Sequence, residues 1–186
     1  SAFAFDFDPS DGIGAGLIDF VGVAVHELMH AMGFTSGVDV LDFNSPGNGP
    51  FDDFEFDPFA TVLDFTRVSA NSVNAGADMD WTASNLAKDY SIDGGTTTLI
   101  SNAWSLGVIH GDGRQASHWK DGLGIGIMDP TAQPAGSLNV VTANDLQALD
   151  VIGWDLFTAP EPGTVVLLAL GLVGVGARRR SDRRLA

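Results

Sequence analysis

The sequence contains no cysteine, which excludes a disulfide framework and any zinc site built from thiolates. Basic residues are also scarce. Of the nine Lys and Arg side chains, only Arg67, Lys88, Arg114 and Lys120 precede residue 160, whereas this part of the chain holds 22 of the 24 acidic side chains. Such an acidic body repels nucleic acid and anionic membrane surfaces, so we expect no nucleic-acid partner.

Glutamate is scarce, and an initiating methionine is absent. Glu27, Glu55 and Glu161 stand against 21 aspartates, and the chain begins at Ser1 without a signal-peptide pattern. Aspartate favours loops and turns, so the composition predicts a loop-rich protein in which calcium sites are one option. We interpret the chain as a fragment or a processed form whose upstream part is missing. Its 186 residues suffice for one domain with its own core, or for two small subdomains that flank a cleft.

The segment from Val25 to Phe34 contains the pattern H-E-x-x-H. Residues four apart lie one turn above each other on one face of a helix, so His26 and His30 can direct two imidazoles at one metal ion. Glu27 lies on the flank of that face, where it can hold a water molecule bound to the same ion. Nitrogen ligands, an open coordination position and an adjacent carboxylate are what a zinc hydrolase requires.

The surrounding residues predict a long helix from about Gly16 to Met32. This segment lacks proline and is apolar almost all round, which is typical of a buried helix. Buried histidine and glutamate side chains need partners because unpaired polar groups are costly to bury, and a metal ion would supply one. The alternative is an ordinary amphipathic helix with one histidine in solvent. Gly33 can adopt the left-handed conformation that ends a helix.

Two further stretches predict strands. Alternating phenylalanines indicate a strand over 1–8, and another is expected over 61–69. Asp93-Gly94-Gly95 indicates a hairpin over 90–101.

The acidic segment 35–58 is interpreted as a loop that is either solvated or binds calcium, and 71–80 as a polar connection. A second amphipathic helix is expected over 142–151, with Thr142 as its N-cap and Asp145 three residues on. Its core-facing side chains would be Leu146, Leu149 and Ile152.

A catalytic zinc ion usually takes three protein ligands, and the motif supplies two of them. The compact continuation H-E-x-x-H-x-x-G-x-x-H is absent because Ser36 occupies its last position. A glutamate ligand is a poor fit as well, since Glu55 lies in a segment rich in Phe, Asp and Pro. The candidates that remain are His118, delivered by a long insertion, Asp39 and His110.

These residues resemble the metzincin metalloproteases, and in particular the leishmanolysin-like arrangement. There, H-E-x-x-H-x-x-G-F is separated by an insertion from a His-Trp pair, and a Met-turn follows. The matching positions here are His26, Glu27, His30, Gly33, Phe34, His118, Trp119 and Met128. The resemblance covers 26–34 and 117–130, and it implies that His118 is the third zinc ligand and that Met128 lies beneath the metal. It extends to bacterial secreted metalloproteases that carry a PEP-CTERM tail.

The chain departs from this family in three respects. Leishmanolysin itself is rich in cysteine, whereas this chain has none. No tyrosine follows Met128, so the fifth ligand of some metzincins is not available there. The sheet that normally precedes the active-site helix is largely missing. The mechanism that the resemblance implies is peptide-bond hydrolysis by a zinc-activated water, with Glu27 as the general base.

The C-terminal tail has a different character. Pro160, Glu161 and Pro162 are followed by an apolar run over 164–177 and then by three arginines, 178–180. The run is shorter than the ~20 residues that span a bilayer comfortably, but its basic flank favours a membrane segment over a buried helix. The order of these features resembles the PEP-CTERM sorting signal of Gram-negative envelope proteins, which is a substrate of exosortase-type enzymes. It implies export, transient anchoring in the inner membrane through 164–177, and a destination in the cell envelope or extracellular matrix.

Taken together, these features predict an α+β protein in three parts. A metzincin-like catalytic domain would occupy 1–157, with a buried active-site helix, a small sheet and a loop-rich C-terminal subdomain with one further helix. A linker with the PEP motif follows over 158–163, and the sorting signal over 164–186.

The predicted function is an exported zinc-dependent endopeptidase that acts on a protein or peptide substrate, with Zn²⁺ as cofactor and Ca²⁺ as a further option. Two rival hypotheses stay open. One is a catalytically silent zinc-binding envelope protein. The other is a calcium-binding matrix adhesion module in which the motif is accidental.

Overall fold

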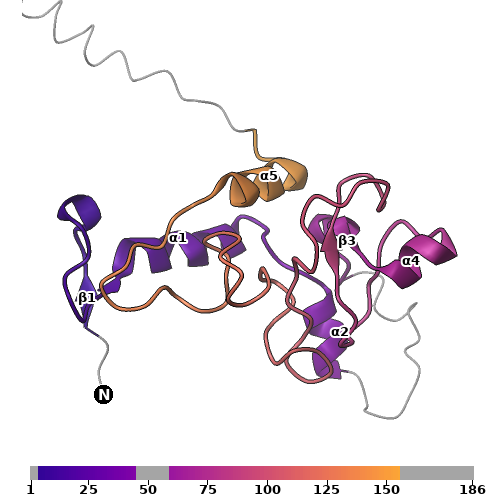
Figure 1. The fold of residues 1–186 in the computed structure, drawn as a ribbon, viewed down its shortest axis with the longest axis horizontal. Helices are drawn as coiled ribbons and strands as arrows, with labels where there is room; N and C mark the ends of the chain where they lie inside the picture. The colour runs from indigo at the N-terminus through magenta and orange to yellow at the C-terminus, as the bar shows by residue number, and fades with distance from the viewer. Residues whose placement is uncertain (1–3, 45–58, 156–186) are drawn as a thin grey trace, which may run out of the picture. The chain divides into compact units, whose positions relative to one another are not determined.

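The computed structural model describes residues 4–44 and 59–155 (Figure 1). The chain divides into two units, Ser1–Asp155 and Leu156–Ala186. The first unit is α+β, with two small sheets: β1 pairs with β2 in parallel, and β3 pairs with β4 antiparallel. Its elements in chain order are β1 (Phe5–Asp6), the 3-10 helix η1 (Pro9–Asp11), β2 (Ile18–Asp19), α1 (Phe20–Ala31), α2 (Val38–Asn44), the 3-10 helix η3 (Val62–Thr66), β3 (Arg67–Val68), α4 (Ala70–Ala75), β4 (Asp89–Tyr90) and α5 (Ala143–Ile152).

Helix α1 carries the H-E-x-x-H pattern and begins at Phe20 rather than at about Gly16. The reason is its N-cap, Asp19, whose carboxylate accepts a hydrogen bond from the Gly22 amide at 2.8 Å. The same carboxylate accepts a hydrogen bond from the Asn139 amide at 3.0 Å. The helix ends as predicted, with Gly33 in the left-handed region at φ 106°.

The prediction that α1 is buried on every side is wrong. Gly22 and Met29 are its buried residues, whereas Leu28 is 61% exposed and Val21 is 39% exposed. One face packs on the core, and the opposite face is not covered by the residues that the structure describes. Apolar composition predicts that a helix needs cover, but it does not say which part of the chain provides it.

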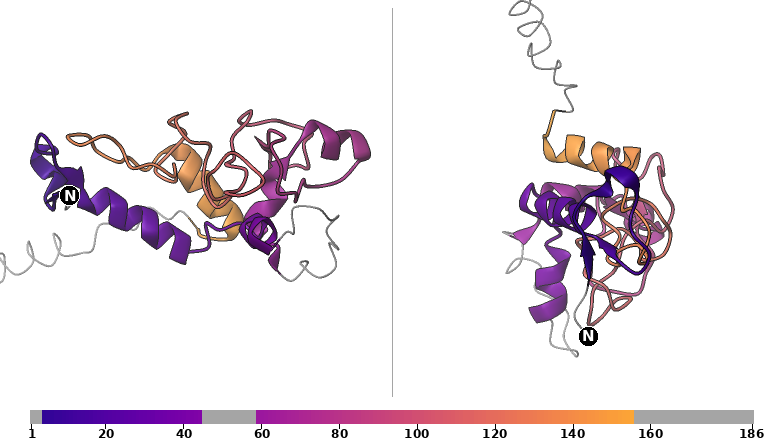
Figure 2. Two further views of the ribbon diagram at one scale, coloured as in Figure 1. Left: turned by 90° about the horizontal axis from the view of Figure 1, so that it is seen from below. Right: turned by 90° about the vertical axis from the view of Figure 1, so that its left-hand side faces the viewer.

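The C-terminal part of this unit runs alongside α1 in the same direction, as Figures 1 and 2 show. Near the start of the helix, the Gly136 amide donates a hydrogen bond to the Leu17 carbonyl at 2.8 Å. Near its end, Trp154 Nε1 donates to the Met32 carbonyl at 2.8 Å. The segments before and after α5 are therefore hydrogen-bonded near the two ends of α1, the helix that bears the motif.

Helix α5 confirms the second predicted helix and its cap. Thr142 and Asp145 form a capping box, in which the Asp145 carboxylate accepts a hydrogen bond from the Thr142 amide at 2.7 Å. Leu149 is buried and Ile152 packs against the core, as expected. Leu146 is 39% exposed, so its predicted core position is wrong. The inward face follows 145, 148, 149 and 152, and Leu146 lies outside that stripe.

The core is built around aromatic rings. Trp104 and Trp119 stack with their ring centroids 4.4 Å apart. Phe34 and Tyr90 both contact these two rings in tilted or edge-on geometry. All four side chains are fully buried. Two of them adjoin the predicted site in sequence, because Phe34 follows α1 and Trp119 follows His118.

The prediction of an acidic loop over 35–58 is wrong for 38–44, which form the short helix α2. Its two carboxylates accept hydrogen bonds from backbone amides, and calcium binding by the acidic segment stays a prediction. Asp42 is buried and accepts hydrogen bonds from the amides of Ile109 and His110, and Asp39 accepts them from Ala116 and Ser117. The rest of the predicted loop, including Glu55, lies outside the described residues.

Three other segments differ in part from the predicted elements. Of the strand expected over 1–8, the described residues 4–8 contain β1, and residues 1–3 lie outside the described part. The strand expected over 61–69 is mostly η3, with β3 at its end, and the connection expected over 71–80 begins with α4. Capping boxes at Thr61 and Ser69 turn the chain into these short helices, a local hydrogen-bonding preference that alternation of apolar residues does not reveal.

The hairpin expected over 90–101 is present as an antiparallel bridge between Tyr90 and Ile100, across a turn with Gly94 at φ 63° and Gly95 at φ 84°. Within 4–44 and 59–155, no helix combines the length and the apolar character needed to cross a membrane. The predicted membrane segment, 164–177, lies outside the described residues.

Candidate metal centre

Three histidines from two distant parts of the chain meet in the structure. His26 and His30 project from α1, and His118 comes from an irregular loop 88 residues after His30. Their ring centroids lie 4.8 to 5.2 Å apart, and one nitrogen of each ring lies within 4.8 Å of the others. Of the three candidates for a third ligand, the structure thus brings His118 to the motif, whereas Asp39 and His110 are not in this group.

The closest approach in the group is between Nε2 of His30 and Nε2 of His118, at 3.1 Å. Two nitrogen ligands at the 2.0–2.1 Å bond length of zinc, set at a tetrahedral angle, lie about 3.3 Å apart. The spacing of this pair is therefore close to that of two ligands on one zinc ion.

Each ring is oriented through its other nitrogen. In every case Nδ1 lies against a backbone carbonyl oxygen: His26 and Ile127 at 2.8 Å, His30 and Phe34 at 2.7 Å, His118 and Gln115 at 3.2 Å. A carbonyl oxygen can only accept, so Nδ1 carries the proton and donates it, and Nε2 of the neutral ring keeps a lone pair. Histidine metal ligands are usually held in this way, with the second nitrogen donating to a carbonyl or carboxylate.

The facing lone pairs of His30 and His118 repel each other unless a cation or a proton lies between them. Burial lowers the pKa of His118 to about 4, and the nearby His30 lowers it in the same direction. Because His118 is only 6% exposed, solvent does little to relieve this repulsion. Near neutral pH His118 is therefore a neutral imidazole, the form that binds a metal ion. The donor set of three oriented imidazoles fits a zinc ion.

The three histidines line one open pocket of about 380 Å³ together with Glu27. Its other lining residues are Val108, Pro130 and the segment 113–115. Glu27 is exposed to solvent. Within the part of the chain that the structure describes, its carboxylate has no hydrogen-bond or ion-pair partner. A carboxylate in this position, without a competing partner, is suited to accept a proton from a molecule in the pocket.

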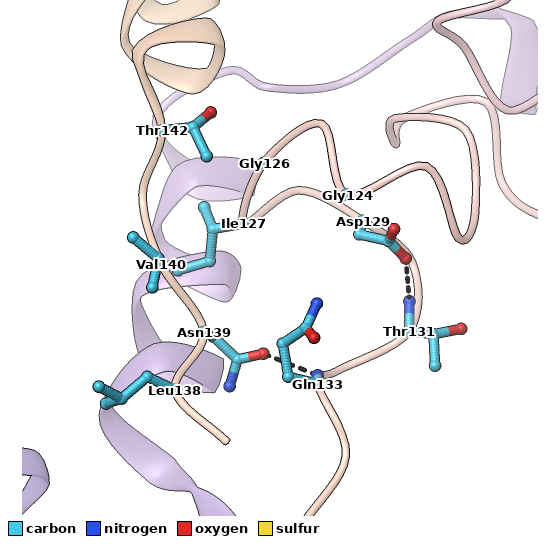
Figure 3. A pocket seen from close by; sticks show the side chains of 10 residues that line it. All are labelled: Gly124, Gly126, Ile127, Asp129, Thr131, Gln133, Leu138, Asn139, Val140 and Thr142. Atoms are coloured by element: carbon cyan, nitrogen blue, oxygen red, sulfur yellow. Dashed lines mark hydrogen bonds between the residues drawn. The ribbon is translucent and has the colours of Figure 1, made fainter. Parts of the chain in front are cut away.

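Two smaller hollows lie nearby. One of about 130 Å³ shares His26, Glu27 and Pro130 with the histidine pocket. The other, of about 240 Å³, is shown in Figure 3. In its wall, Asp129 accepts a hydrogen bond from the Thr131 amide at 3.1 Å, and Asn139 accepts one from the Gln133 amide at 2.9 Å. No histidine is among the described residues that line this second hollow, so it does not offer the donor set of the histidine pocket.

Met128, predicted to lie beneath the metal, is fully buried in the core. Its carbonyl accepts a hydrogen bond from the Trp119 amide at 2.9 Å, while the carbonyl of the preceding Ile127 orients His26. The turn at 126–128 thus links His26 to the residue that follows His118. The contact of the Met128 side chain with a metal stays a prediction.

Asp145 is a supporting residue that the sequence revealed only as a helix cap. Its fully buried carboxylate also accepts hydrogen bonds from Trp119 Nε1 at 2.8 Å and from the Ile127 amide at 2.9 Å. Gly126 lies so close that a Cβ atom there would clash with this carboxylate. The capping-box pattern explains the bond to Thr142, but no pattern in the sequence points to the two more distant donors.

Comparison with known proteins adds information on the tail. A family model described as the PEP-CTERM protein-sorting motif matches residues 158–180. This chain carries a PEP-CTERM sorting motif. The motif supports an exported protein with a C-terminal sorting tail, and it implies processing by an exosortase-type sorting enzyme. No curated protein and no solved structure matches the chain.

Proposed function

We propose that this chain is an exported zinc-dependent endopeptidase of the metzincin type. The observation that carries the proposal is the convergence of three imidazoles, each with Nδ1 held by a carbonyl, beside the exposed carboxylate of Glu27 in one open pocket. The sorting motif supports the exported location. A site that only stabilises the fold would need neither an open pocket nor an adjacent carboxylate.

The residues of the pocket would have separate roles in hydrolysis. Zinc held by His26, His30 and His118 would lower the pKa of water and polarise the carbonyl of a peptide bond. The backbone carbonyls that accept from Nδ1 keep the three rings oriented, with Nε2 toward the pocket as the metal-binding atom. Glu27 would take the proton from the attacking water and pass it to the amine that leaves.

The test is cleavage of casein and of a mixed peptide library by the full chain, before and after removal of metal with a chelator. We expect cleavage that a chelator abolishes and added zinc restores. In Glu27→Gln, activity should fall by about 10²- to 10⁴-fold, the usual contribution of a general base, while the zinc content stays that of the wild type.

Two outcomes would contradict the proposal. A folded protein that holds zinc but cleaves no peptide would favour the silent zinc-binding envelope protein. A folded protein that holds no zinc would favour the adhesion module.

A further inference from the structure

We propose that Asp39 and Arg67 together clamp the residue Ala116, two positions before His118, and that this clamp sets the affinity of the three-histidine site for its metal. The inference rests on the proposed function, since it concerns how the same site binds zinc. It assigns positioning roles to two side chains that do not themselves reach the pocket nitrogens.

His118 needs hydrogen bonds from outside its own segment to hold its position, whereas His26 and His30 do not. His26 and His30 are positioned by the hydrogen bonds of α1 itself. His118 lies in a loop outside the named helices and strands, and the regular pairing next to it is a single bridge between Trp104 and Trp119. Its position therefore depends on what the loop backbone is bonded to.

Asp39 accepts hydrogen bonds from the backbone of this loop. Its Oδ1 accepts a hydrogen bond from the Ala116 amide at 2.6 Å, and its Oδ2 accepts one from the Ser117 amide at 3.1 Å. The Ser117 hydroxyl donates to the same carboxylate. Hydrogen bonds from backbone amides to a carboxylate are charge-assisted and stronger than neutral ones.

Arg67 binds the carbonyl of Ala116, the residue whose amide is bound by Asp39. Its guanidinium donates to the Ala116 carbonyl at 3.0 Å and to the Ser105 carbonyl at 2.8 Å. The side chain is fully buried, with its guanidinium carbon 5.3 Å from the centre of the Trp104 ring. A buried arginine bonded to two carbonyls holds a planar and specific geometry. Ala116 is thus fixed at its amide by a negative group and at its carbonyl by a positive one.

The clamp also connects His118 to the other ligands. Ser36 donates its amide to the Ser117 hydroxyl at 2.9 Å, and it follows closely on Phe34, whose carbonyl orients His30. Asp39 belongs to α2, which continues this same segment. The chain after α1 therefore bonds first to His30 and then to the loop of His118. Loss of such supporting hydrogen bonds around a metal site typically weakens metal binding 10- to 100-fold.

The test compares two aspartates of the same helix. Asp42 is a matched control for Asp39, because it also accepts two backbone hydrogen bonds, from Ile109 at 2.8 Å and His110 at 2.7 Å, but not from the loop at 116–118. Zinc dissociation constants would be measured on the full chain by competition with a chromophoric chelator. Visible absorption of the cobalt(II)-loaded protein would report the ligand geometry, and the melting temperature of each metal-free variant would report stability.

We expect Asp39→Asn to weaken zinc binding by about 10- to 100-fold and to change the cobalt spectrum. Asp42→Asn should lower the melting temperature but leave zinc affinity and the cobalt spectrum as in the wild type. Ser117→Ala is a milder second variant that removes only the hydroxyl between Asp39 and Ser36, and it should weaken zinc binding by a smaller factor.

The outcomes distinguish a failure of the clamp from a failure of the proposed function. If the wild type binds zinc and both Asp39→Asn and Ser117→Ala bind it equally well, the clamp is wrong and the proposed function stands. If Asp39→Asn and Asp42→Asn weaken binding to the same extent, the effect is general destabilisation and the clamp is again wrong. A wild-type protein that binds no zinc overturns the proposed function, and the clamp with it.

Discussion

Replacing Asp145 with alanine would disturb the turn that supports the metal centre and the helix cap of α5 together. The carboxylate is fully buried. The donors that would lose their acceptor include Trp119 Nε1, the Ile127 amide and the Thr142 amide. A buried donor left without a partner costs about 1–3 kcal/mol. Because Thr142 is only partly buried and water can replace its bond, we expect a total loss of about 4 kcal/mol in the free energy of unfolding.

The loss would be measured by urea and thermal unfolding of the metal-free protein, followed by tryptophan fluorescence. For a domain of this size, about 4 kcal/mol corresponds to a fall in melting temperature of roughly 8–16 °C. Zinc affinity should fall as well, since the Ile127 carbonyl orients His26. Asp150→Asn is the matched control, an exposed aspartate of the same helix, and it should stay within about 0.5 kcal/mol of the wild type. If Asp145→Ala unfolds within about 1 kcal/mol of the wild type, this carboxylate does not anchor the turn and the reasoning is refuted.

Two further predictions concern Gly126 and His118. Gly126→Ala should destabilise the protein by about 1–3 kcal/mol, because the new Cβ meets the buried Asp145 carboxylate. Gly14→Ala is the control, since the Cβ added there meets mainly the end of the flexible Leu17 side chain. Equal urea midpoints for the two variants would contradict the prediction. The pKa of His118 is lowered to about 4 in the folded protein, so between about pH 6.5 and 4 the unfolded state binds a proton that the folded state does not. Stability of the metal-free protein should therefore be lost as the pH falls through that window, by up to about 3 kcal/mol. Urea midpoints at pH 7 and pH 5 should differ less in His118→Asn than in the wild type, and an unchanged difference would show that His118 is not the group responsible.

The sequence predicts best where the chemistry is local. The spacing of His26 and His30 on one helix, the glycine that ends it and the cap of α5 each depend on residues a few positions apart, and the structure has all three. The sequence misplaces the start of α1 because an aspartate in a strand-like setting, Asp19, is hard to recognise as a cap. Apolar composition overestimates the burial of α1 because the cover of a helix depends on distant parts of the chain.

Long-range contacts explain the rest. Spacing alone leaves His118, Asp39 and His110 as candidates, and the resemblance to metzincins favours His118. The structure brings His118 to the motif and gives Asp39 a different role, as an acceptor for the loop that presents it. The sequence predicts a loop in place of helix α2 because these seven residues carry little helical periodicity. The aspartates of α2 bond to segments far away in sequence. No local pattern encodes such partners.

The most direct test of the three-histidine site is the zinc content of the full chain after exhaustive dialysis, measured for the wild type, His118→Asn and His110→Asn. We expect close to one zinc per chain in the wild type and in His110→Asn, and a large loss in His118→Asn. A wild type without zinc, a His118→Asn variant that keeps zinc, or a His110→Asn variant that loses it would contradict the three-histidine site.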